Sequence, residues 1–281
     1  GHGQPEVNHE QLKKRGPDAT KVISGENYHA VFYRLAIVGV ENGMQPFTYG
    51  NCVLLCNGEI YNHEELSERS SKSQTGSDCE CIIWMYKKYG IEYTVKSLDG
   101  EFAFVLYDKE KEIIYFARDR FGRKPLFYSP FIDEADENKV EGIEMSSTYS
   151  GLANDTSREF VLPGYLYTYD VKAKDLSVQP YHLFMFNPKP YVSVGGALDD
   201  IYYALNDAVV KRITQSERPV GFLLSGGFDS SLVLSMALES ERMSQPPHVF
   251  TIGFEEKASD VLAAERMVDW LKKKHGENCL I

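Results

Sequence analysis

The segment from Val220 to Ser231 constrains the fold of this chain more than any other. Val220 to Leu224 is an apolar run that indicates a buried strand, and a glycine-rich turn separates it from an apolar-periodic run that indicates a helix. This order brings free backbone N–H groups and the positive end of a helix to one point, which is an anion site. Gly226 and Gly227 let the backbone approach a phosphate closely.

Polar side chains add to this turn. Ser225, Ser230 and Ser231 supply hydroxyl donors. Asp229 repels phosphate, so it is expected to hold the loop or a Mg²⁺ ion that bridges to the phosphate. The segment lacks the G-x-x-x-x-G-K-[ST] pattern, which excludes a Walker loop. A plain surface turn is the alternative, and the flanking strand and helix argue against it.

Composition sets broad limits. The 281 residues are enough for two modest domains of roughly 100–200 residues each. A net charge of -11 argues against a nucleic-acid surface or an acidic membrane as a partner. No apolar run approaches the ~18 residues of a membrane span. The five cysteines lack framework spacing, so free thiols in a reducing compartment, the cytoplasm, are expected.

The first half of the chain is rich in predicted strands. Apolar, β-branched and aromatic runs occupy 29–38, 52–56, 102–107, 113–117, 126–128 and 166–169. The charged turn 108–111 predicts a hairpin between the third and fourth of these runs. One helix is predicted around Ile82, Ile83 and Tyr86, with Gly90 as its stop. Consecutive antiparallel strands with few helices predict stacked or sandwiched sheets.

The pattern changes near Tyr191. Residues 187–196 are rich in Pro, Gly and small residues and are interpreted as a linker. A helical stripe from Leu198 to Val209, the strand 220–224, a helix to about Leu238, a strand at 249–254 and a helix at 260–274 follow. This alternation predicts a parallel sheet and two domains, 1–190 and 191–281. Two strands are few for such a sheet, so we expect the second domain to be incomplete.

Five charged or glycine-containing strings stand out in the first half, at 15–18, 34–38, 57–62, 76–80 and 118–126. Arg34 lies inside an apolar run, where a guanidinium needs a carboxylate. A ligand carboxylate would satisfy it, and so would a structural ion pair with Asp18 or Glu59. Residue types alone favour the ion pair.

Asn57 and Gly58 offer a side-chain amide and a backbone N–H, the form of an oxyanion hole. Asn-Gly is equally a common hairpin turn. Glu59 and Asp78 are suited to hold an amino group by charge-assisted hydrogen bonds. Asp78 is equally suited to be the N-cap of the helix that follows it.

In their order, these strings resemble class II glutamine amidotransferase domains, which are N-terminal-nucleophile hydrolases. The loop at 225–231 resembles the pyrophosphate loop of the N-type ATP pyrophosphatases. Together they make the chain resemble the glutamine-hydrolysing asparagine synthetases. The resemblance implies an α+β N-terminal-nucleophile hydrolase fold of stacked antiparallel sheets with helices, followed by part of an α/β HUP-like parallel-sheet domain.

The resemblance also implies a reaction and its sites. ATP, aspartate and glutamine would yield asparagine, glutamate, AMP and pyrophosphate, with Mg²⁺ as cofactor and its ligands unknown. The implied glutamine-binding residues are Arg34, Ile37, Val38, Asn57, Gly58, Glu59 and Asp78, of which Asn57 and Gly58 are also the oxyanion donors. The implied ATP-binding residues are Leu224, Ser225, Gly226, Gly227, Asp229, Ser230, Ile252 and Gly253. The oligomeric state stays open, with a homodimer as one option.

One departure concerns the nucleophile, which in the family is a cysteine at the mature N-terminus. Here position 1 is Gly1, and the first cysteine is Cys52. Either a short N-terminal piece precedes these residues or the amidase has lost its nucleophile, and the intact glutamine strings favour the first. The alternative hypotheses are a related amide- or β-lactam-forming synthetase with an inactive glutaminase, and a non-catalytic module that binds glutamine or nucleotide.

Overall fold

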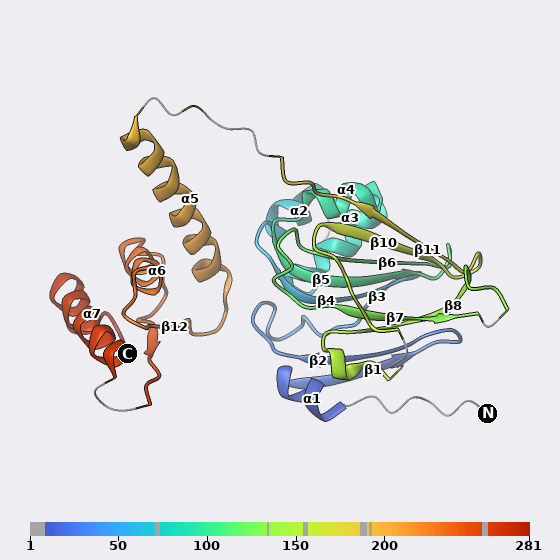
Figure 1. Cartoon of the computed structure of the whole chain (residues 1–281), viewed down its shortest axis with the longest axis horizontal. Helices are drawn as coiled ribbons and strands as arrows, with labels where there is room; N and C mark the ends of the chain where they lie inside the picture. Colours follow the sequence, from blue (N-terminus) through green and yellow to red (C-terminus); the bar gives the residue numbers. More distant parts are fainter. Residues whose placement is uncertain are drawn as a thin grey trace. The chain divides into compact units, whose positions relative to one another are not determined.

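The computed structural model describes residues 9–70, 74–133, 135–153, 157–185, 190, 193–254 and 258–281. The chain forms two compact units, Gly1–Met185 and Phe186–Ile281. Figure 1 shows both, with β-strands dominating the first and helices the second.

A six-stranded sheet is the centre of the first unit. Its order is β11-β10-β6-β5-β4-β3, and each neighbouring pair is antiparallel. The strands are β3 (Phe47–Tyr49), β4 (Cys52–Ile60), β5 (Gly100–Asp108), β6 (Ile113–Arg118), β10 (Tyr165–Asp170) and β11 (Asp175–Pro180). The predicted hairpin between 102–107 and 113–117 is confirmed, because β5 and β6 pair directly.

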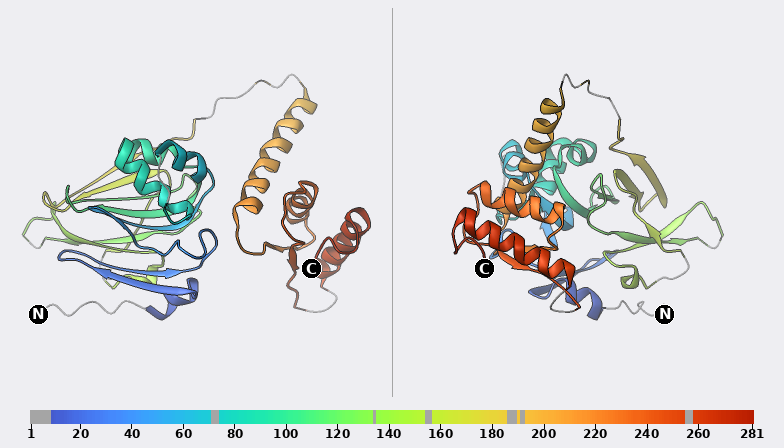
Figure 2. Two further views of the ribbon diagram at one scale, coloured as in Figure 1. Left: turned by 180° about the vertical axis from the view of Figure 1, so that it is seen from behind. Right: turned by 60° about the vertical axis from the view of Figure 1, so that its left-hand side comes forward.

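Helices cover one face of this sheet (Figure 2). They are α2 (His63–Ser70), the 3-10 turn η1 (Asp78–Glu80), α3 (Cys81–Tyr89) and α4 (Ile91–Ser97). Alternate residues of β4 and β5 pack with α3 in the larger hydrophobic cluster, which includes Leu54, Ile83 and Phe104. The predicted stop of α3 is confirmed at Gly90, whose φ of 81° favours glycine.

Further strands stack against the other face. β7 (Phe127–Ile132) pairs with β8 (Val140–Ser146) and with β9 (Glu159–Phe160), and Phe116, Tyr128 and Tyr167 fill the space between the sheets. A separate hairpin is formed by β1 (Ala19–Ser24) and β2 (His29–Arg34), with α1 (His9–Arg15) before it and η2 (Tyr149–Gly151) near by. Stacked antiparallel sheets with helices are the predicted α+β arrangement.

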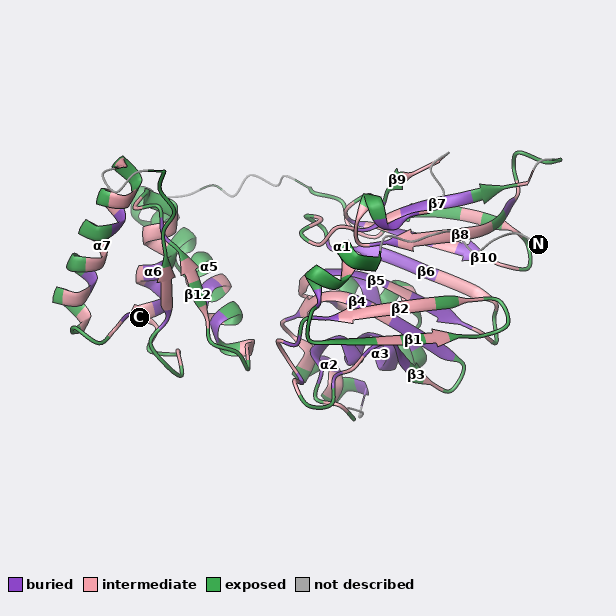
Figure 3. Cartoon of the chain, turned by 90° about the horizontal axis from the view of Figure 1, so that it is seen from below, coloured by how far each residue is buried: buried purple, intermediate pink, exposed green. Residues whose placement is uncertain are grey.

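The second unit alternates helices and strands. It contains α5 (Val194–Gln215), β12 (Gly221–Leu223), α6 (Phe228–Glu239), β13 (His248–Phe250) and α7 (Ser259–His275). β12 and β13 are parallel, as predicted. Leu234 of α6 and Leu271 of α7 are buried in a small core, while much of each helix surface is exposed (Figure 3). No helix in the described ranges combines the length and apolar character needed to cross a bilayer.

Several predicted boundaries are wrong. The strand expected at 29–38 ends at Arg34, because Asp18 binds the backbone N–H of Ala36 and the chain turns away. The strand expected at 52–56 continues to Ile60, and the one expected at 249–254 ends at Phe250. No prediction covers the helices α1, α2 and α4 or the strands β1, β3, β8, β9 and β11.

The predicted C-terminal boundary of the linker at 187–196 is also wrong, because α5 begins at Val194. Gly195 and Gly196 lie in the first turn of α5, because the Ser193 hydroxyl accepts a hydrogen bond from the N–H of Gly196 and caps the helix. Residues 187–189 and 191–192 lie outside the described residues.

Candidate functional site

Three of the predicted strings meet at one end of β4. The backbone at Gly39, directly after the 34–38 string, packs on that of the 76–80 string, since a Cβ added to Gly39 would lie 2.7 Å from the Ser77 nitrogen. The 76–80 string in turn contacts β4, where the Asp78 carboxylate accepts a hydrogen bond from the Ile60 N–H at 2.7 Å. Residues far apart in the sequence thus surround one small region.

Arg34 is the last residue of β2 and is buried. Its guanidinium donates to the carbonyl oxygens of Val40, at 2.9 Å, and Gly39, at 2.5 Å. The ion pair expected from residue types is wrong, because among the described residues no carboxylate pairs with Arg34, and Asp18 binds the Ala36 N–H instead. A buried guanidinium that bonds only neutral carbonyls is suited to bind an anionic ligand group.

Ile37 and Val38 lie in the loop after β2 and are half-buried. Arg34 holds the next two residues of this loop by their carbonyl oxygens. These two hydrogen bonds hold the loop beside the guanidinium, although the loop is not part of a strand.

Asn57, Gly58 and Glu59 lie within β4, opposite Ala103, Phe102 and Glu101 of β5. The turn interpretation of Asn57-Gly58 is therefore wrong. Any side chain at Gly58 would collide with β5, since an added Cβ would lie 2.1 Å from the Glu101 carbonyl oxygen. Glycine is required here by close backbone approach rather than by a turn.

The backbone N–H of Gly58 faces away from β5. Its cross-strand partner Phe102 exchanges hydrogen bonds with Asp119 on the other side of β5, so Gly58 and Phe102 form a pair without mutual backbone bonds. Within the described part of the chain, nothing accepts a hydrogen bond from the Gly58 N–H or from the Asn57 side chain. These are donors suited to an oxyanion.

Asp78 is 5% exposed. Burial raises the pKa of its carboxyl group, while the N–H of Ile60 and the nearby His63 act in the opposite direction. The N-cap alternative is wrong, because Ser77 occupies that position of η1 and the Asp78 carboxylate turns to Ile60. A buried carboxylate of this kind is suited to bind an ammonium group.

Two buried polar residues were missed from the sequence. The Glu80 carboxylate accepts five hydrogen bonds, from Tyr49, Gln74, Trp84 and the N–H and hydroxyl of Thr75. Burial opposes ionisation of Glu80, but the hydrogen bonds from Thr75, Trp84 and Gln74 outweigh it and lower the pKa. Gln45 binds the backbone of β4 with its side-chain amide. Glu80 ends the 76–80 string, where its residue type alone indicates no role, and Gln45 belongs to none of the five strings.

The glycine-rich turn of the second unit joins β12 to α6. Gly226 has a φ of 73°, and a Cβ there would lie 2.4 Å from the Ala263 backbone carbon. Ser225 and Ser230 contact each other through their hydroxyl oxygens at 3.1 Å, and Gly227 is the N-cap of α6 without a side-chain cap. The first N–H groups of α6 therefore have no capping side chain, as an anion site requires.

Other residues predicted to bind ATP lie around this turn. Leu224 is buried and its N–H donates to the Phe250 carbonyl oxygen at 2.8 Å. Asp229 is exposed in the first turn of α6. Ile252 and Gly253 lie beyond β13 rather than in it, and the Ile252 side chain is 83% exposed.

Comparison with known proteins identifies the family of the chain. A family model described as a glutamine amidotransferase domain matches residues 4–180, more than half of the chain. The chain belongs to the glutamine amidotransferase domain family. A second model, described as asparagine synthase, matches residues 200–279. The amidotransferase match covers the Arg34, Asn57 and Asp78 segments, and the second match covers the glycine-rich turn.

Curated relatives carry both segments. The Homo sapiens protein named asparagine synthetase [glutamine-hydrolyzing] is 33% identical over 292 residues, which cover 95% of this chain and 52% of the human one. The Zea mays protein of the same name is 34% identical, with coverages of 95% and 45%. This amidotransferase chain thus spans about half the length of the curated relatives it matches.

Among solved structures, a glutamine phosphoribosylpyrophosphate amidotransferase from B. subtilis, complexed with ADP and GMP, is 17% identical with a TM-score of 0.41. It covers 73% of this amidotransferase chain and 48% of its own.

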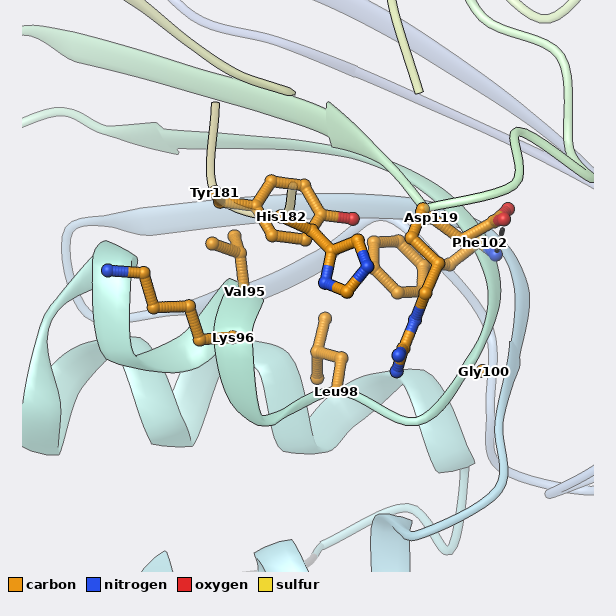
Figure 4. Close-up of a pocket in the computed structure, with 9 residues that line it drawn as sticks. Val95, Lys96, Leu98, Gly100, Phe102, Asp119, Tyr181 and His182 are labelled. Atoms are coloured by element: carbon orange, nitrogen blue, oxygen red, sulfur yellow. Dashed lines mark hydrogen bonds between the residues drawn. The ribbon is translucent and has the colours of Figure 1, made fainter. Parts of the chain in front are cut away.

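None of the predicted glutamine residues lines a pocket of about 170 Å³ in the amidotransferase unit (Figure 4), although its lining residue Phe102 pairs with Gly58 across β4 and β5. The pocket is lined by Val95, Lys96, Leu98, Gly100, Phe102, Asp119, Arg120, Tyr181 and His182. Asp119 already accepts hydrogen bonds from backbone N–H groups, and the Tyr181 hydroxyl donates to the Arg118 carbonyl oxygen at 2.6 Å. In Figure 4 the Lys96 amine points away from the other labelled side chains. The polar groups of Asp119 and Tyr181 therefore serve the fold.

Proposed function

We propose that this chain is the glutaminase domain and the first part of the ATP pyrophosphatase domain of a glutamine-dependent asparagine synthetase. We assign residues 1–190 and 191–281 to these domains. The observation that carries the proposal is the meeting of Arg34, Asp78 and the open Gly58 N–H at one end of β4, in a chain that also has the glycine-rich turn.

The three groups suit the three polar parts of glutamine. The α-carboxylate would bind Arg34, beside the backbone of Ile37 and Val38, and the α-ammonium group would bind Asp78 with support from Glu59. The side-chain carbonyl would then point to the Asn57 amide and the Gly58 N–H. These donors would stabilise the oxyanion that forms when a thiolate attacks this carbonyl.

The attacking thiolate does not come from the described cysteines of the first unit. Cys52, Cys56, Cys79 and Cys81 are all buried. Burial raises the pKa of the Cys52 and Cys81 thiols. For Cys79, a hydrogen bond with Cys56 is the main cause of a raised pKa, and burial is the second. The family's N-terminal cysteine is the expected nucleophile. Five free cysteines fit a reducing compartment, and we place the enzyme in the cytoplasm.

The second unit would use the released ammonia. The aspartate side-chain carboxylate attacks the α-phosphorus of ATP and pyrophosphate leaves. Ammonia then attacks the activated acyl carbon, and AMP leaves with the acyl oxygen. Phosphate oxygens would bind the N–H groups at the start of α6, where Gly226 packs against Ala263 of α7 and the buried Ser231 hydroxyl has no partner among the described residues.

Mg²⁺ would enter with the nucleotide and neutralise the triphosphate. Among the described residues no group of three or more His, Cys, Asp or Glu side chains is placed to hold a metal. Phosphate oxygens would therefore be its main ligands, with Asp229 as the carboxylate that the loop offers.

Replacing Arg34 tests the glutamine assignment. In the full-length enzyme, Arg34→Ala should lower glutamine-dependent synthesis by about 100-fold or more, because the substrate carboxylate loses a charged partner. Ammonia-dependent synthesis should be unchanged. Parallel assays with glutamine and with ammonium salt measure both, and an equal loss of both would defeat the assignment.

A substrate screen separates this function from the alternatives. ATP-dependent AMP release with aspartate supports an asparagine synthetase. Turnover of another carboxylate without aspartate turnover would indicate a related synthetase, and glutamine binding without ATP turnover would indicate a binding module.

A further inference from the structure

The edge of β4 that faces away from β5 is paired first with β3 and then with a side chain. β3 pairs with β4 so that Phe47 lies opposite Leu54. Continuing this antiparallel register would place Gln45 opposite Cys56. The chain has left the sheet by then, and the Gln45 side chain takes the place of the missing backbone.

The Gln45 amide makes both of the hydrogen bonds that a strand residue would make. Its Nε2 donates to the Cys56 carbonyl oxygen at 3.0 Å, and its Oε1 accepts from the Cys56 N–H at 2.7 Å. The residue is 5% exposed, so water does not replace these bonds. A side-chain amide donates through its nitrogen and accepts through its oxygen, so it matches the N–H and C=O of one strand residue.

Farther along the same edge, the structure leaves one N–H without an acceptor among the residues that it describes. The Ile60 N–H is bound by the Asp78 carboxylate, and the Gly58 carbonyl oxygen accepts from the Cys79 thiol at 3.5 Å. The Gly58 N–H lies between the two side-chain caps and has no acceptor among the described residues.

A continued β3 would close this opening. Two further residues in the same register would place Gly43 opposite Gly58. Gly43 instead packs near Arg34 and Ser77, since a Cβ there would lie 3.0 Å from the Arg34 Nη2 and from the Ser77 Cβ. The departure of the chain at Gln45 therefore keeps the site open.

We propose that Gln45 is a positioning residue of the glutaminase: its amide ends the β3–β4 ladder at Cys56 and so holds the Gly58 N–H open for the carbonyl oxygen of glutamine. This inference rests on the proposed function. Gln45 does not touch the substrate in this scheme, and it acts through the backbone of β4.

Three variants of the full-length enzyme test the proposal. Gln45→Met keeps the side-chain length and removes both hydrogen bonds. Gln45→Glu keeps the acceptor, and its carboxyl group donates to the Cys56 carbonyl only when protonated. Gln179→Met, on the exposed strand β11, is the matched control.

In Gln45→Met, kcat for glutamine hydrolysis should fall by at least about 10-fold, short of the ~10²–10³-fold that follows loss of an oxyanion donor itself. KM for glutamine should change little, because Arg34 and Asp78 remain. Ammonia-dependent synthesis and the control should match the parent. The activity of Gln45→Glu relative to Gln45→Met should rise as the pH falls.

Amide hydrogen exchange without ligand gives a readout that does not need activity. In the parent the Gly58 amide should exchange fast while those of Cys56 and Ile60 are protected, and Gln45→Met should release Cys56. Parental kcat in Gln45→Met, or a protected Gly58 amide in the parent, would overturn the inference. A parent that neither binds nor hydrolyses glutamine, with Gly58 open, would overturn the proposed function instead.

Discussion

At the residue scale, the buried Asp78 carboxylate is suited to bind a ligand but lowers the stability of the fold when it is charged. Burial raises the pKa of its carboxyl group above the ordinary 3.8. A carboxyl group with a raised folded-state pKa stabilises the fold below its unfolded-state pKa, and that contribution is lost as the pH rises through the folded-state value. The charged form is therefore held in an unfavourable place until an ammonium group binds it.

Asp78→Asn should accordingly be more stable than the parent at pH 7, because the amide keeps an acceptor for the Ile60 N–H and carries no charge. Its affinity for glutamine should fall by roughly 10- to 100-fold, as expected for loss of a hydrogen bond to a charged group. Urea unfolding at neutral and acidic pH and calorimetry with glutamine measure the two effects. Lower stability of the variant at pH 7 would show that the buried charge is already compensated.

At the scale of elements, the loop 74–77 and the short 3-10 turn η1 that follows it carry Asp78 into the site. Glu80 holds this loop through the N–H groups of Gln74 and Thr75, and Trp84 and Tyr49 hold Glu80 from the other side. The Thr75 hydroxyl binds Glu80 and accepts from the Ser77 N–H at 3.2 Å, so the anchoring reaches the residue next to Asp78.

Glu80→Gln should therefore loosen the loop, because an amide cannot accept all of these donors. We expect a loss of about 1–3 kcal/mol in the free energy of unfolding. KM for glutamine should rise more than kcat falls, since Asp78 binds substrate. Steady-state kinetics with glutamine and with ammonia measure this, with Glu65→Gln on the exposed side of α2 as the control. A parental KM would contradict the role given to the loop.

Local sequence patterns predict many of the elements and are wrong where side chains redirect the backbone. The β5–β6 hairpin followed from apolar runs and a charged turn, which are local properties. The end of β2 did not, because residues 35–38 are as apolar as a strand and only the Asp18 carboxylate, from before β1, shows that the chain turns. The hydrophobic pattern of residues 35–38 is the same with or without this distant partner, so it cannot predict the turn.

At the scale of the whole molecule, a substitution that destabilises one unit should leave the activity of the other unchanged. Gly226→Ala places a Cβ against the Ala263 backbone at a φ of 73°, which strains the turn before α6. We expect it to cost roughly 2 kcal/mol or more in the second unit and to abolish ATP-dependent AMP release. Glutamine hydrolysis should persist, because the first unit has its own core. Loss of both activities would show that the units are coupled.

The sequence by itself determined the family and the order of the sites. The strand, glycine turn and helix at 220–231 and the strings at 34–38, 57–62 and 76–80 need particular residue types at fixed spacing, and these can be read without coordinates. Only the tertiary structure decided how they work together. Arg34 proved to bind loop carbonyls and no described carboxylate, and Asn57-Gly58 proved to lie within a strand. The Gly58 N–H is open because Gln45 and Asp78, distant in the sequence, occupy the positions on either side of it. Hydrogen bonds between distant residues depend on how the whole chain packs, and no local pattern encodes them.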